Sequence, residues 1–292
     1  MQKKITSYLF SVLVLLSLLV GVIGCSAQGA DLLPAKERLQ VATTTSLYDT
    51  GLWGYLEPMF EEKHDVELDV LYAGTGIALE YGRRGDVDVI TVHAKSREQK
   101  FIAEGYGVKR VPFAYNYFLV VGPSADPAGI KGMSPEDALR KLEQTSAGVF
   151  ISRGDDSGTH SKEKSLWEGA GLKYDAIRGA KEWYIEAGRG MGPTLLMASE
   201  KQAYTLVDMG TFLAFKGKVD LVPIVDKGSM LLNVYSAIAV DPDKNPKVSY
   251  EMANNLIDFL TSPEIQGLIG DYGTKQYGMR LFTPCAGAEP QL

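Results

Sequence analysis

The segment SRGDDSGTH, from Ser152 to His160, concentrates polar and charged side chains that could do chemistry. Two kinds of site are compatible with it. Asp155, Asp156 and His160 could be metal ligands or acid–base groups of a hydrolase. Arg153 and the Ser-Gly-Thr turn could instead bind an anion, because a guanidinium group pairs with two oxygens at once.

Two earlier segments share the organisation of this one. TTTS (43–46) follows a predicted strand and precedes a predicted helix, as does AGTG (73–76). Small residues let backbone N–H groups approach a ligand closely, the first N–H groups of a helix are unpaired, and hydroxyl groups donate hydrogen bonds without adding charge. Each turn alone is typical of an ordinary helix N-cap. Three such turns in one cleft predict a site for a tetrahedral oxyanion.

The aspartates of this segment constrain how it can bind an anion. A carboxylate beside a dianion is repulsive, so we expect Asp155 and Asp156 to point away from the ligand or to pair with Arg153 or Lys162. Phosphate is the exception, because it retains a proton near neutral pH and could donate it to an aspartate.

The hydrolase interpretation has less support from the sequence. The three histidines, at positions 64, 93 and 160, occur in no HExxH motif and no Cys/His cluster. His93 follows a predicted strand and is a secondary candidate for the anion site, together with Gly74 and Tyr204. Core packing is an equally good interpretation of Tyr204. We therefore expect a binding protein rather than an enzyme, without a metal or other cofactor.

Strand-like and helix-like patterns alternate along the chain, which predicts mostly parallel sheets covered by helices. Strands are expected at 39–45, 66–72, 86–92, 114–123, 147–152, 182–186, 203–207, 219–225 and 231–240. Helices are expected at 52–64, 76–84, 95–104, 134–145, 248–261 and 263–269, and after Ser157 and Gly192. The two long apolar strands, 114–123 and 231–240, suggest two crossings between lobes. We expect a first lobe of residues 38–116 plus 233–292 and a second lobe of residues 117–232.

The N-terminus resembles that of a secreted lipoprotein. Lys3 and Lys4 precede an apolar run from Leu9 to Ile23, which is short for a membrane span and typical of a signal peptide. The run ends in VIGC (22–25), which is similar to the lipobox of bacterial lipoproteins. This resemblance implies a signal peptide of residues 1–24, lipidation of Cys25, and a tether of residues 25–37. Cys285 would then be the only thiol left, so no intramolecular disulfide is expected.

The overall charge disfavours nucleic acid as a partner. The formal net charge of the 292 residues is −6, and no basic stripe is present to neutralise phosphates. Local backbone dipoles can still hold a small anion in an acidic protein.

Five segments together resemble the tungstate-binding proteins of bacterial tungstate ABC transporters. They are ATTTSLYDTGL (42–52), AGTGIALE (73–80), DVDVITVHA (86–94), SRGDDSGTHSKE (152–163) and EAGRGMGPTLLMASEKQAYTL (186–206). The resemblance covers residues 38–283. It implies a two-lobed α/β fold of the periplasmic-binding-protein type (class II), with the ligand in the cleft between the lobes. The donors carried over by motif are Thr44, Thr45, Ser46, Thr75, Arg153, Ser157, Gly158 and Thr159.

The same resemblance implies the biology of the chain. We expect a monomer that captures tungstate in the periplasm or on the outer face of the cell membrane and delivers it to an ABC transporter permease. Molybdate has the same charge and shape as tungstate, so the choice between them depends on the resemblance alone. A phosphate or molybdate binder of the same fold and a metal-dependent phosphoester hydrolase are the alternatives. Two segments depart from the family pattern: after AYTL, Val207 replaces a polar residue and Met209 an arginine, and in LLNVY (231–235) Val234 replaces a proline.

Overall fold

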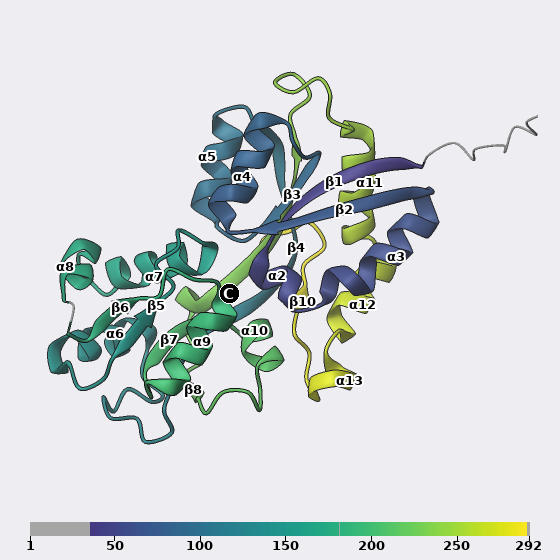
Figure 1. Ribbon diagram of the computed structural model, residues 1–292. Helices are drawn as coiled ribbons and strands as arrows, with labels where there is room; N and C mark the ends of the chain where they lie inside the picture. Colours follow the sequence, from purple (N-terminus) through teal and green to yellow (C-terminus); the bar gives the residue numbers. More distant parts are fainter. Residues whose placement is uncertain (1–35, 181, 291–292) are drawn as a thin grey trace, which may run out of the picture. The chain divides into compact units, whose positions relative to one another are not determined.

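The computed structural model describes residues 36–180 and 182–290 (Figure 1). The predicted signal peptide, Cys25 and nearly all of the tether lie outside these residues. Strands β1 to β10 of the described part are Glu37–Thr44, Val66–Ala73, Val89–Val92, Gly107–Gly122, Phe150–Ser152, Tyr184–Glu186, Tyr204–Asp208, Val222–Val225, Leu232–Val240 and Thr283–Pro284. Helices α2 to α13 are Thr45–Asp49, Leu52–His64, Thr75–Arg84, Lys95–Ala103, Pro135–Thr145, Gly158–Gly169, Tyr174–Gly179, Met191–Glu200, Met209–Ala214, Tyr250–Thr261, Pro263–Asp271 and Thr274–Tyr277, and a 3₁₀ turn covers Ser229–Leu231. None of the helices in these residues is long and apolar enough to cross a bilayer.

The strands form one mixed sheet with the order β2-β1-β3-β9-β4-β7-β5-β6, and β8 and β10 both pair with β4. The pairs β1–β2, β1–β3, β5–β6 and β5–β7 are parallel. The antiparallel pairs are made by the long strands β4 and β9, which run between the two groups of parallel strands. The expected parallel sheets are therefore present in each lobe, and the sheet as a whole is mixed because the crossing strands run antiparallel to their neighbours.

The first lobe is built around β1, β2, β3, β9 and the N-terminal half of β4. Alternate residues of its strands face two different cores. Leu39, Val41 and Val89 pack with α3, α11 and α12 on one face, whereas Ala42 and Ile90 pack with α4 and α5 on the other. The sheet of this lobe is therefore a buried layer between two helical layers (Figure 1).

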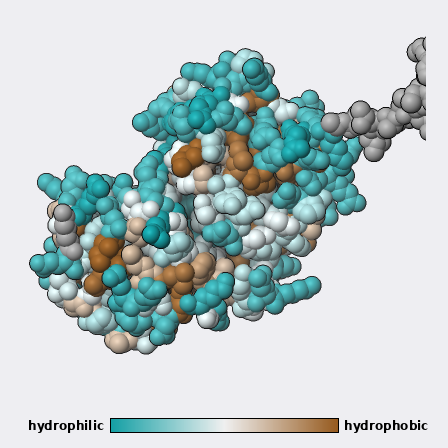
Figure 2. Space-filling model, viewed as in Figure 1, coloured by the Kyte–Doolittle hydropathy of each residue, from teal (hydrophilic) through white to brown (hydrophobic). Residues whose placement is uncertain are grey.

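The second lobe repeats this arrangement around the C-terminal half of β4 and β5 to β8. Phe118 and Val120 pack against α6 and α7, with Trp167 fully buried between them. Leu119 and Val121 face the opposite core, which α9 and α10 cover. Figure 2 shows a mostly hydrophilic face with smaller apolar patches on both lobes. Exposed apolar side chains include Leu71 of β2 (40% exposed) and Ile77 of α4 (55% exposed).

Three features of the fold differ from the expected elements. The strand predicted at 114–123 begins at Gly107, because its first half pairs with β9 through two register shifts. The strand predicted at 147–152 is shorter and begins at Phe150. The short helices α2, α8, α10 and α13, of four to six residues each, were not predicted because they span fewer than two turns and carry little periodic signal.

Candidate functional site

The three predicted turns meet at one small enclosed cavity between the lobes. Two of them follow the C-terminal ends of β1 and β2 in the first lobe, and the third follows β5 in the second lobe. In this arrangement of the lobes the cavity is too narrow to hold a water molecule. Seven of the eight predicted donors line it: Thr44, Thr45, Ser46, Thr75, Arg153, Ser157 and Gly158. The secondary candidates Gly74 and His93 line it as well. We call this space the three-turn cavity.

Local sequence explains how each turn is formed. Thr44 caps α2 and accepts a hydrogen bond from the N–H of Leu47 at 3.4 Å. Gly74 precedes α4 and has no side chain, so no side-chain cap accepts a hydrogen bond from the first N–H groups of α4. Ser157 caps α7 by accepting from the N–H of His160 at 3.2 Å. Each helix therefore presents its positive N-terminal end near the cavity.

Three residues that line this cavity have a buried polar atom without a hydrogen-bond partner among the described residues: Thr75 Oγ1, Arg153 Nε and His93 Nδ1. Thr159, the eighth predicted donor, does not line the cavity but follows Gly158 in α7, and its Oγ1 is also without a partner. Thr75 and Thr159 are 0% and 1% exposed, so water does not hydrate them freely. Buried polar groups without partners are costly and rare in proteins. A ligand with several acceptor oxygens would satisfy the hydroxyl and guanidinium donors of this set.

Arg153 is the buried cation of the cavity, with 4% exposure. Its Nη2 forms a close ion pair with Asp155 Oδ2. Asp156 turns to the opposite lobe, where its carboxylate accepts from Arg97 Nη2 at 2.6 Å and its carbonyl accepts from Arg97 Nη1 at 2.8 Å. Both aspartates therefore have cationic partners. Asp156 pairs with Arg97, which the sequence did not single out, rather than with Lys162.

His93 forms the wall of the cavity as a neutral imidazole. Burial, followed by the positive charge of Arg153, lowers the pKa of His93 to about 3. Its Nε2 lies 3.1 Å from Ser46 Oγ, and its ring packs near those of Phe118 and Tyr235. His93 contributes shape and one hydrogen bond to the site, and no charge at neutral pH.

The lobes also approach each other closely at Gly158. A Cβ atom there would lie 2.7 Å from His93 Cε1 and 2.8 Å from Thr75 Oγ1, both in the first lobe. Contacts this short do not occur at real Cβ atoms, so only glycine fits in this arrangement of the lobes.

Tyr204 does not line the cavity, and its inclusion among the ligand donors is corrected. It begins β7 and is fully buried in the core of the second lobe. Its hydroxyl donates to Asp126 Oδ1 at 2.7 Å and accepts from the N–H of Ala128 at 3.0 Å. The core interpretation of Tyr204 is the one that the structure supports.

The metal-site interpretation of Asp155, Asp156 and His160 also fails geometrically. Asp155 and Asp156 are bound to Arg153 and Arg97, respectively. The imidazole of His160 accepts from the N–H of Asp156 at 3.0 Å through Nδ1 and contacts the Tyr174 hydroxyl at 2.6 Å through Nε2. Across residues 36–180 and 182–290, no three His, Cys, Asp or Glu side chains are grouped so as to hold a metal ion.

The fold and this cavity define a solute-binding protein of the two-lobed class. A model of the PBP superfamily domain matches residues 33–264. The tungstate-binding protein TupA of Peptoclostridium acidaminophilum is 41% identical to the chain over 293 residues, covering 98% of this chain and 99% of the relative. The chain belongs to this family of tungstate-binding proteins.

Two solved structures agree with that assignment. The tungstate-binding protein TupA from Desulfovibrio alaskensis G20 has a TM-score of 0.74 and 40% identity, covering 86% of this chain and 99% of the other. The structure described as the tungstate ABC transporter from Geobacter sulfurreducens has a TM-score of 0.73 and 50% identity, covering 82% of this chain and all of the other.

Proposed function

We propose that this chain is an extracytoplasmic solute-binding protein that captures tungstate in the three-turn cavity and delivers it to an ABC transporter permease. The observation that carries the proposal is the pair of unpartnered buried donors at one small cavity, Thr75 Oγ1 and Arg153 Nε. The names of the relatives supply the identity of the ion. We also propose that the protein acts as a monomer, without enzymatic activity or a cofactor.

The proposed ligand donors come from both lobes. The first lobe contributes Thr44, Thr45, Ser46, Thr75 and Gly74, and the second contributes Arg153, Ser157, Gly158 and Thr159. Hydroxyl and N–H donors bind the oxygens of the anion, and Arg153 supplies the counter-charge. Because the site excludes water, each charge-assisted hydrogen bond is stronger than it would be at the surface.

Closure of the lobes completes this site. We propose that the chain crosses between lobes near residues 116–117 within β4 and near residues 232–233 at the start of β9. The Arg97–Asp156 pair joins α5 of the first lobe to the turn before α7 of the second. This contact supports a closed arrangement in which donors of both lobes reach the same ion.

Glycine at position 158 should be required for closure around the ligand. We expect Gly158→Ala to weaken tungstate binding about fivefold to 150-fold, since overpacking costs about 1 to 3 kcal/mol. Calorimetric titration with tungstate measures the change. Gly54→Ala is the matched control, because no atom lies within 4 Å of a Cβ at that helical position. Equal affinities for the two variants would contradict the close approach of the lobes.

The selectivity of the site follows from the positions of its aspartates. Asp155 and Asp156 both have arginine partners, so neither is free to accept a proton from phosphate. We therefore expect thermal unfolding to be shifted by tungstate at far lower concentrations than by phosphate, with molybdate and sulfate as the competing tetrahedral dianions. Ligand at about a hundred times its dissociation constant adds about 2.7 kcal/mol to the free energy of unfolding. A shift with phosphate alone would support the phosphate binder instead.

We further propose that Cys25 carries a lipid anchor that holds the protein at the outer face of the membrane or in the periplasm. The proposal is supported by the VIGC segment at residues 22–25. In fractionated cells, we expect the wild-type protein in the membrane pellet. The Cys25→Ala variant should carry no lipid, and either its signal peptide remains uncleaved or the protein is released from the membrane. A Cys285→Ala variant is the control. The absence of a lipid mass shift on the wild-type N-terminal peptide would contradict the anchor.

A further inference from the structure

A second and larger cavity lies against the three-turn cavity. Its volume is about 420 Å³, and it shares His93 and Gly158 with the smaller space. The His93 side chain therefore forms part of the wall between the two. The larger cavity is lined mainly by α5, α7, β4, β9 and the C-terminal segment, and the named donors Thr44, Thr75 and Arg153 take no part in it.

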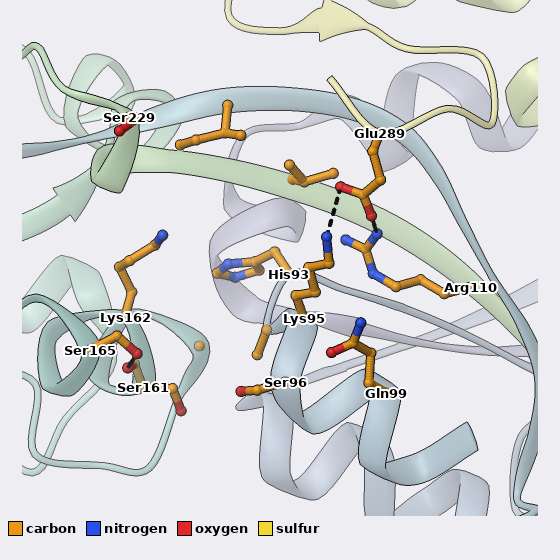
Figure 3. A pocket seen from close by; sticks show the side chains of 14 residues that line it. His93, Lys95, Ser96, Gln99, Arg110, Ser161, Lys162, Ser165, Ser229 and Glu289 are labelled. Atoms are coloured by element: carbon orange, nitrogen blue, oxygen red, sulfur yellow. Dashed lines mark hydrogen bonds and ion pairs between the residues drawn. The ribbon is translucent and has the colours of Figure 1, made fainter. Parts of the chain in front are cut away.

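Three cationic side chains surround this second cavity. Lys95 and Arg110 belong to the first lobe and Lys162 to α7 of the second, and Figure 3 shows their nitrogen atoms pointing toward the same space. Within the described residues, no carboxylate lies at ion-pair distance from Lys162, whose ammonium group donates to the carbonyl of Met230 at 3.0 Å. Burial lowers the pKa of Lys162 to about 8, so the ammonium group is still mostly charged at neutral pH.

Arg110 is only partly satisfied although its side chain is 8% exposed. Its Nε pairs with the buried carboxylate of Glu98, and its Nη1 pairs with Glu289. Its Nη2 has no partner in the described chain and is fully buried. Arg110 lines the cavity, so an anion that displaces Glu289 from the guanidinium group could also satisfy this N–H.

Glu289 shows what kind of group fits against these cations. Its carboxylate bonds Arg110 and lies 3.4 Å from Lys95 Nζ (Figure 3), while its side chain remains 44% exposed. Arg110 and Lys95 thus pair with the carboxylates of Glu98 and Glu289, whereas Lys162 has no carboxylate partner in the described residues. The three cations and two carboxylates together leave a net positive charge around this cavity, even with the Glu289 carboxylate included.

We infer that this second cavity is an additional anion site that takes a small carboxylate or oxyanion between Arg110 and Lys162, and that Glu289 competes with this ligand from within the chain. The site is weaker and less selective than the three-turn cavity. Its lysine ammonium groups are flexible point charges rather than a fixed set of hydroxyl and N–H donors. The space is also wider and more open to salt, which screens such contacts.

The experiment uses the purified protein with one equivalent of tungstate already added to fill the three-turn cavity. Acetate, whose carboxylate matches that of Glu289, and further tungstate are then titrated by calorimetry in low salt at neutral pH. Glu289→Gln should bind at least one probe with a dissociation constant of about 1 mM or lower. Lys162→Met or Lys95→Met, each introduced into Glu289→Gln, should weaken this binding about tenfold. Lys100→Met, on the exposed side of α5, is the control and should leave it unchanged.

The outcomes separate this inference from the proposed function. Binding of acetate alone identifies a carboxylate site, and binding of tungstate as well identifies a general anion site. The inference is overturned if neither probe binds to Glu289→Gln. It is also overturned if neither lysine substitution changes the dissociation constant. If the first equivalent of tungstate fails to bind, the proposed function fails, and the acetate titration still tests the second cavity.

Discussion

Arg153→Ala is expected to weaken tungstate binding roughly 30-fold to 3,000-fold. Removing one partner of a buried, hydrogen-bonded charge pair costs about 2 to 5 kcal/mol. Arg153 is 4% exposed and has an unpartnered Nε at the cavity, so its loss removes both the counter-charge and a donor. Arg153→Lys should give an intermediate affinity, because an ammonium group keeps the positive charge but lacks the planar set of N–H donors that pairs with two oxygens. Calorimetric titration measures each dissociation constant.

Two further variants make the result on Arg153 interpretable. Arg153→Ala leaves the Asp155 carboxylate without its partner, so the double variant with Asp155→Asn separates repulsion of the anion by Asp155 from loss of Arg153 itself. Arg280→Ala removes an exposed arginine that pairs with Asp271 and is the control for net charge. An Arg153→Ala protein that unfolds at the wild-type temperature and binds tungstate as the wild type does would remove Arg153 from the site.

Glu163→Gln is expected to stabilise the protein at alkaline pH by up to about 3 kcal/mol. Glu163 lies fully buried beneath the Arg153–His160 turn, and burial raises the pKa of its carboxyl to about 7. The carboxylate accepts from Ser152 at 2.7 Å, Tyr184 at 2.6 Å and Trp167 at 3.1 Å, which offsets only part of the burial cost. Glutamine retains the volume and an acceptor oxygen without the charge.

The sign of the pH dependence follows from the folded and unfolded pKa values. Below pH 4.5, the ordinary value, Glu163 is protonated in both states. Between pH 4.5 and about 7 the unfolded chain releases the proton while the folded protein keeps it, so the contribution of Glu163 to the free energy of unfolding falls as pH rises. Above that range both states are ionised and the penalty is constant. The difference in stability between Glu163→Gln and wild type should therefore grow through this window and then level off.

Chemical unfolding at a series of pH values measures this difference. Glu168→Gln, on the exposed side of the same helix, should show no comparable growth with pH. A Glu163→Gln protein that is less stable than wild type at pH 8 would mean that the ionised carboxylate stabilises the turn through its three donors by more than its burial costs.

The fold was largely predictable because the strand and helix signals are strong and local. The apolar runs of β1, β3 and β9 and the amphipathic pattern of α6 identify these elements without tertiary information. The start of β4 at Gly107 was not predictable, because that half of the strand is defined by pairing with β9, more than a hundred residues away. The mixed character of the sheet was not predictable for the same reason, because its antiparallel pairs depend on the long-range pairing of β4 with β9.

The site was predictable turn by turn, whereas its electrostatics were not. Small and hydroxyl residues between a strand and a helix point to Thr44, Thr75 and Ser157 directly. Arg97 stands in a charged helix, where its sequence context is that of an ordinary surface residue, and only the folded arrangement places it beside Asp156. Tyr204 was ambiguous for the opposite reason, since a tyrosine near a strand end can face a cleft or a core with the same local sequence.

The location of tungsten in crystals grown with tungstate tests most directly whether the three-turn cavity is the tungstate site. Tungsten scatters anomalously, so its position needs no assumption about the ligand. We expect the strongest anomalous peak in the three-turn cavity, where the oxygens of tungstate reach the hydrogen-bond donors of Thr75 and Arg153. A strongest peak anywhere else, or no ordered tungsten at saturating tungstate, would contradict it.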